Sequence, residues 1–79
     1  MPNPFSSETK IKFYVPDGFN SAQLVINDAQ GKQLKSFDIK NAGYNEITIH
    51  ANEFAAGSYL YSLLIDGEKA VSKMMELTK

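Results

Sequence analysis

Apolar and polar residues alternate in several short stretches of the chain, and each stretch predicts a β-strand with one buried face. In the first stretch, the apolar side chains of Ile11, Phe13 and Val15 fall on one side of the strand. A second strand begins near Ala22, and further alternating stretches follow to the end of the chain. The expected strands therefore cover residues 10–15, from 22 onward, 32–39, 45–51, 59–65 and 70–77.

Turn-forming residues separate these strands. Asp66 followed by Gly67 is the strongest hairpin signal, because a tight two-residue turn needs positive φ at its centre. The segment 28–31, which ends in a glycine, predicts a second hairpin. Antiparallel neighbours joined by short turns are therefore expected at both places.

Two irregularities interrupt the alternation. In the segment 32–39 the pattern slips by one residue near Lys35 and Ser36, which predicts a bulge or a bend. After the strand that follows, Asn52 is expected to cap a single helical turn that ends at Gly57. Such a turn is a common way to cross from one sheet to another.

The segment 59–65 is the most hydrophobic strand and carries apolar residues on both faces, which predicts a central position in a sheet. About six or seven short strands with no helical period predict an all-β fold, a small Ig-like antiparallel β-sandwich. Residues 9–79 are expected to form this sandwich. Residues 1–8 contain Pro2 and Pro4, which favour extended backbone, and are expected to form a tether.

Composition narrows the function classes. The chain has 79 residues, of which 43% are hydrophobic, and this is enough for one domain with one modest core. Its lysines and acidic residues nearly balance at a net charge of −1, and it contains no arginine, which argues against nucleic-acid binding. The absence of cysteine excludes disulfides, zinc–thiolate sites and thiol catalysis.

Few side chains suit catalysis or metal binding. His50 is the only histidine, and a lone imidazole supplies neither a catalytic triad nor the three or four ligands of a zinc site. Asp17, Asp28 and Asp66 lie in or beside turns, where a carboxylate accepts hydrogen bonds from backbone N–H groups. We therefore expect no enzymatic activity, no catalytic residue, no metal site and no cofactor.

Two groups of exposed residues suggest binding instead. Tyr14 and Tyr44 lie on the polar phases of their strands, so a shared aromatic patch on a carbohydrate-binding or adhesive module is one alternative. Lys69 and Lys73 lie on the last strand. If that strand is at a sheet edge, its lysines either prevent aggregation or flank a strand-addition site, and an edge-strand homodimer is a related expectation. A further alternative is a purely structural spacer domain that has no binding site.

The chain also resembles a known family. The segments that carry the resemblance are Asn3-Pro4-Phe5, Thr9 to Phe13, Asp28 to Lys32, Gly43-Tyr44-Asn45, Gly57-Ser58-Tyr59 and the ending from Gly67 to Met75. Together they resemble the type A C-terminal sorting domain of the type IX secretion system. The resemblance covers nearly the whole chain in the order of the family.

This resemblance implies a secretion address. It implies an upstream cargo domain that enters the periplasm, an outer-membrane shuttle and translocon that carry the cargo to the cell surface or the medium, and a sortase-like protease that removes the domain. One methionine of the pair at positions 74 and 75 is expected to point outward. The resemblance places the recognition residues at Gly57, Tyr59, Gly67, Lys69, Lys73, Met74 and Met75.

Overall fold

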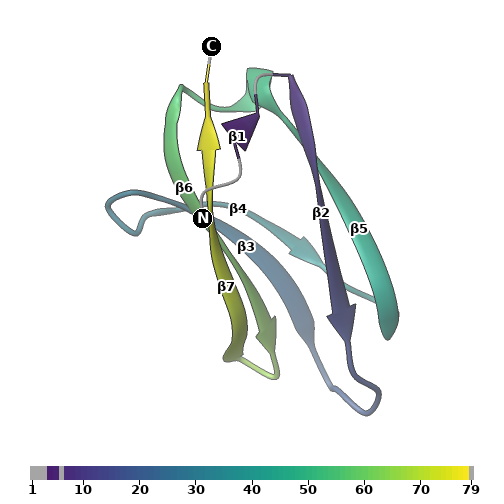
Figure 1. The fold of residues 1–79 in the computed structure, drawn as a ribbon. Helices are drawn as coiled ribbons and strands as arrows, with labels where there is room; N and C mark the ends of the chain where they lie inside the picture. The colour runs from purple at the N-terminus through teal and green to yellow at the C-terminus, as the bar shows by residue number, and fades with distance from the viewer. Residues whose placement is uncertain (1–3, 6, 79) are drawn as a thin grey trace.

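Seven strands and one 3₁₀ helix make up the part of the chain that the computed structural model describes, residues 4–5 and 7–78 (Figure 1). The predicted number of strands is confirmed. In chain order the elements are β1 (Pro4–Phe5), β2 (Glu8–Val15), β3 (Ala22–Asp28), β4 (Gln33–Asp38), β5 (Gly43–His50), η1 (Ala51–Glu53), β6 (Gly57–Ile65) and β7 (Glu68–Leu77).

The strands form two sheets. The larger sheet has the order β1-β7-β6-β3-β4, and β2 pairs with β5 in the smaller one. The pairing is antiparallel throughout, except that β1 runs parallel to β7. Figure 1 shows β2 and β5 as a separate layer beside the larger sheet. The antiparallel β-sandwich expected from the alternation is confirmed, as is the central position of β6.

The alternating apolar residues form the core between the sheets. Ala22, Leu24 and Ile26 of β3 are each at most 4% exposed, and they pack with Ile11 of β2 and Ile49 of β5. Burial of one leucine or isoleucine side chain of this kind stabilises the fold by about 1.5–3 kcal/mol. The longest strands, β6 and β7, complete this cluster with Tyr59, Leu63, Met75 and Leu77.

The predicted bulge in the third expected strand is confirmed and lies one residue earlier. Ile26 pairs with Lys35, whereas Asn27 pairs with Gln33, so Leu34 is the extra residue of β4. Because a bulge shifts the side-chain phase by one, Leu34 stays exposed while Lys35 shares the face of Ile26.

The helical turn begins earlier than predicted. Asn52 lies inside η1, whose N-cap is His50 without a side-chain capping bond. The N–H of Ala51 donates to the carbonyl of Ser7 at 2.8 Å, and this bond ties the first residue of η1 to the start of β2. The predicted cap at Asn52 is therefore wrong, because the backbone bond to the neighbouring strand sets where the helix begins.

Two of the three aspartates expected at turns, Asp28 and Asp66, accept hydrogen bonds from backbone N–H groups. Asp66 (φ 51°) and Gly67 (φ 84°) form the tight turn between β6 and β7. The Asp66 carboxylate accepts hydrogen bonds from the N–H groups of Asn20 and Ser21 at 2.7 and 2.9 Å, so this turn is tied to the loop between β2 and β3. Asp28 accepts two bonds, at 2.8 and 3.0 Å, from N–H groups of its own turn.

The segment expected to form a tether is described in part. Residues 1–3 and 6 lie outside the described residues. Pro4 and Phe5 form β1 beside the end of β7, and β2 begins at Glu8. A linking role for residues 1–8 stays a prediction.

Candidate recognition surface on the C-terminal hairpin

β7 runs along one side of the larger sheet. β6 pairs with it along its whole length, whereas β1 pairs with Glu76 and Leu77. Among the described residues, the edge of β7 from Glu68 to Met75 therefore has no strand beside it. Such an edge presents backbone N–H and C=O groups to a partner strand. The edge position on which the expected role of the last strand depends is present over this stretch.

A β-bulge places the two lysines of β7 on opposite faces. Val71 pairs with Leu63, but Lys69 pairs with the next residue, Leu64, so β7 has one extra residue between them. Lys73 shares the face of Val71, which looks toward the smaller sheet. Lys69 shares the outer face with Leu64. The predicted recognition residues therefore belong to two surfaces.

Two of the predicted recognition residues lie in the core. Met75 is fully buried and Tyr59 is 7% exposed, and the two are cross-strand partners. The Tyr59 hydroxyl donates a hydrogen bond to the carbonyl of Ala55, and its ring packs against Phe54 with the ring centroids 5.3 Å apart. Both side chains are therefore needed for packing, and a part in recognition stays a prediction.

Two others are glycines that shape the backbone. Gly57 (φ 152°) begins β6 directly after the helical segment, and Gly67 (φ 84°) completes the hairpin turn. Both φ values lie in regions that other residues rarely adopt. These glycines therefore position β6 and β7 rather than offering side chains to a partner.

The remaining three residues are accessible. Met74 is 50% exposed, and Lys69 and Lys73 are also exposed. Within the described part of the chain, the side chain of neither lysine makes a hydrogen bond or an ion pair. The expected division of the methionine pair is confirmed, with Met74 outward and Met75 inward.

The outer face of the larger sheet is shallowly hollowed beside these residues. Met74 and Leu60 line a groove of about 270 Å³ together with the turn between β3 and β4. Lys69 lines a second groove of about 340 Å³, whose floor includes Val25 and Leu64. Apolar side chains on the outer face of a sheet provide contact area for a partner.

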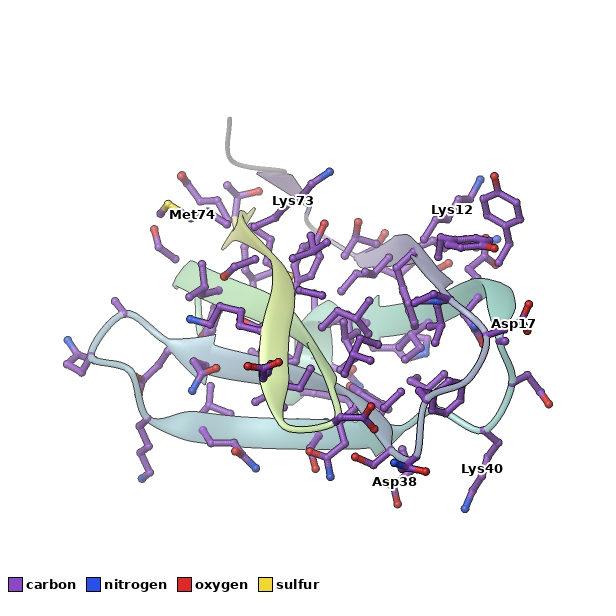
Figure 2. All side chains as sticks on the ribbon, turned by 90° about the horizontal axis from the view of Figure 1, so that it is seen from below. Lys12, Asp17, Asp38, Lys40, Lys73 and Met74 are labelled. Carbon is purple, nitrogen blue, oxygen red and sulfur yellow. The ribbon has the colours of Figure 1, made fainter. Side chains whose placement is uncertain are left out.

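A third groove lies on the inner side of β7, and the sequence did not point to it. It has a volume of about 240 Å³ and lies between β2 and β7, with Lys12 and Tyr14 on one side and Val71 and Lys73 on the other. Figure 2 shows Lys12 and Lys73 extending on the same side of the molecule, with Lys40 on the opposite side. The alternation placed Lys12 on the exposed face of its strand, but no local signal says that β2 faces β7.

Tyr14 and Tyr44 are cross-strand partners in the smaller sheet. Their ring centroids are 5.1 Å apart with the ring planes inclined at 66°, and the residues are 54% and 90% exposed. The expected shared patch is therefore present, although the inclined rings do not make the flat platform that stacks on a sugar. Carbohydrate binding stays a prediction.

The described residues contain few groups suited to catalysis. His50 is exposed, and its Nδ1 lies 3.9 Å from the Glu8 carboxylate. No group of three or more histidines and carboxylates that could hold a metal occurs in residues 4–5 and 7–78. No helix in this part of the chain is long and apolar enough to cross a membrane.

Comparison with solved structures defines the class of fold. The chain is similar to the crystal structure of CopC from Methylosinus trichosporium OB3b, with a TM-score of 0.66. The similarity covers 96% of this chain and 82% of that chain at 19% sequence identity, so it shows a shared β-sandwich fold alone. No curated protein matches the sequence.

The family is shown by a match over nearly the whole chain. The family model for the secretion system C-terminal sorting domain matches residues 1–76. The chain therefore belongs to the type IX secretion C-terminal sorting domains, and the resemblance predicted from its segments is confirmed. Membership implies a protein that is exported to the cell surface and that works with the type IX secretion system.

Proposed function

We propose that this domain is the secretion signal of a cargo protein. The cargo enters the periplasm, and the folded domain then directs it through the outer-membrane translocon of the type IX system, after which a sortase-like protease removes the domain. The domain acts by being recognised and has no enzymatic activity of its own. The observation that carries this proposal is the family match over residues 1–76.

The side chains best suited to recognition in this proposal are those of β7. Lys69, Lys73 and Met74 are exposed, and their side chains have no hydrogen-bonded or ionic partner among the described residues. They lie along an edge that β1 covers at one end. An outer-membrane shuttle that binds this hairpin would contact lysine charges, an apolar side chain and unpaired backbone groups along the same strand.

Export of a fusion tests the proposal. A fluorescent reporter carrying an N-terminal export signal and residues 1–79 at its C-terminus is expressed in hosts with and without a working type IX translocon. The proposal expects surface or medium fluorescence in the first host and periplasmic retention in the second. Equal surface fluorescence in both hosts, or retention of the folded fusion in both, would contradict it.

Point variants locate the recognised surface better than truncation does. Removal of the end of β7 would also remove Met75 and Leu77 from the core and unfold the domain. Instead, Lys73→Gln and Met74→Ser are compared with Lys40→Gln, a control lysine on the opposite side of the molecule (Figure 2). The β7 variants should reduce export with little change in stability, since substitution of an exposed lysine costs about 0.5 kcal/mol or less and that of the half-exposed Met74 about 1 kcal/mol or less. Undiminished export of both β7 variants would exclude β7 as the recognised surface.

A further inference from the structure

The two sheets of the sandwich leave a groove between them where Val71 and Lys73 of β7 lie opposite β2. The groove of about 240 Å³ at this place reaches from the surface to the core, because its lining includes the buried side chains of Leu24 and Leu63. Val71 is on the inner face of β7 but is still 44% exposed. An inner-face valine is normally covered by the opposing sheet, whereas no side chain of the described residues fully covers Val71.

The two sides of the groove carry positive charge. Lys73 lies on the β7 side and has no ionic partner among the described residues, and Lys12 lies on the β2 side. The carboxylate nearest to Lys12 is that of Glu46 at 4.0 Å, a loose contact between exposed groups. Among the described residues, no carboxylate lines the groove, and burial raises the pKa of the Tyr61 phenol, so that this lining group is neutral. The groove therefore favours an anionic group near its rim.

The backbone beside the groove is open to strand pairing. β1 already pairs in parallel with β7 at Glu76 and Leu77, so this edge accepts an added strand. The same edge continues toward Val71 and Lys73 without a strand beside it in the described residues. In a strand added there, side chains two positions apart point to the same face. One would lie beside Val71 and the next beside Lys73.

We propose that the groove between β2 and β7 binds an extended segment of a partner protein, in which an apolar side chain enters beside Val71 and an acidic side chain two positions away pairs with Lys73 and Lys12. The backbone of the segment extends the larger sheet at β7. The assignment of that partner to the export machinery rests on the proposed function, whereas the chemistry of the segment follows from the groove.

A second copy of this chain fits the groove less well. At the groove, the inner face of β7 presents Val71 and Lys73 and no carboxylate, because Glu68, the acidic residue on that face, pairs with Ile65 and does not line the groove. Two β7 edges paired about Val71 and Lys73 would therefore bring a further lysine to a groove that already has two. Charge complementarity favours a different, acidic partner.

Peptide binding tests the proposal on the 79-residue chain. The probe is an amidated peptide with the sequence Asp-Thr-Leu-Thr-Asp. The control peptide has lysine in place of both aspartates. Titration followed by amide NMR should give saturable shifts along β7 and β2 with the acidic peptide and none with the basic one. Shifts elsewhere only, or equal binding of both peptides, would overturn the proposal.

Charge reversal supplies the specificity control. Lys12→Glu with Lys73→Glu should weaken the acidic peptide about tenfold or more and allow the basic peptide to bind, whereas Lys40→Glu should change neither affinity. All three positions are exposed, so melting temperatures should stay close to that of the unmodified chain. Unchanged affinity in the double variant would refute the role of the two lysines. A dimer in sedimentation that this variant abolishes would assign the edge to a second copy and overturn the proposal.

Export of the same variants separates this inference from the proposed function. Translocon-dependent export with no peptide binding would leave the sorting function intact and refute the groove as its recognition site. Peptide binding without translocon-dependent export would refute the sorting function and leave a peptide groove. The inference expects the charge-reversed variant to lose both binding of the acidic peptide and export.

Discussion

Met74 and Met75 are adjacent in the sequence, but the structure predicts very different costs for their removal. Met75 is fully buried between the sheets, whereas Met74 is 50% exposed on the outer face. Replacement of a buried methionine by alanine costs about 2–5 kcal/mol, because apolar contact is lost and a cavity remains. For Met74→Ala we expect about 1 kcal/mol or less, since only part of its side chain leaves an apolar contact.

These costs are large for a domain of this size. At about 0.05–0.15 kcal/mol per residue, the free energy of unfolding of this chain is roughly 4–12 kcal/mol. In small domains each kcal/mol shifts the melting temperature by about 4–8 °C, so Met75→Ala should lower it by at least about 8 °C. Thermal and urea unfolding of both variants measures the difference. Equal shifts for Met74→Ala and Met75→Ala would refute the reasoning.

A conservative variant then separates packing from recognition at the same position. Met75→Leu keeps most of the side-chain volume and should cost less than about 1.5 kcal/mol. Because Met75 is fully buried, we expect the Met75→Leu fusion to be exported as well as the unmodified one. Loss of export in a stable Met75→Leu domain would show that Met75 takes part in recognition directly.

Three further predictions concern turns and surface charge. Gly67→Ala should cost about 1–2 kcal/mol in urea unfolding, because φ is 84° there and the space around a new Cβ is open, so the cost is conformational; an unchanged midpoint would contradict this. Asp66→Ala should also cost about 1–2 kcal/mol, since the carboxylate caps two N–H groups of the β2–β3 loop, and Asp66→Asn should cost less; equal costs would argue against the cap. The hydrogen bond from Lys35, 2.6 Å away, holds the pKa of Glu53 in the folded state below its ordinary value of 4.5. The pairing therefore stabilises the fold fully at pH values above 4.5, and this stabilisation is lost as pH falls through the lowered pKa. Carboxyl NMR of Lys35→Met should show the Glu53 pKa rising toward 4.5, and no rise would contradict the contact.

Local sequence signals predicted the strands and the tightest turn. The alternation of Ile11, Phe13 and Val15 defines β2, and the pair Asp66 and Gly67 adopts the positive φ values that the turn requires. These features depend on neighbouring residues only. The family resemblance likewise depends on short segments in a fixed order, and for that reason it could be recognised from the sequence.

Features set by contacts between distant segments could not be predicted in the same way. The cap at Asn52 failed because a backbone bond from Ala51 to Ser7 fixes the start of η1. The bulge between Lys69 and Val71 contains no glycine, and the pattern of polar and apolar residues there does not predict it. The groove beside Lys12 depends on which strand faces β7, and no local pattern contains that information.

The central claim is that residues 1–79 direct export through the type IX translocon and that β7 is the recognised element. The measurement that tests it most directly is the surface fraction of a reporter fused to this chain, in translocon-positive and translocon-negative hosts, with Lys73→Glu and Lys40→Glu as a matched pair. We predict translocon-dependent surface signal that Lys73→Glu abolishes and Lys40→Glu preserves. Surface signal independent of the translocon, or equal export of the two variants, would contradict the claim.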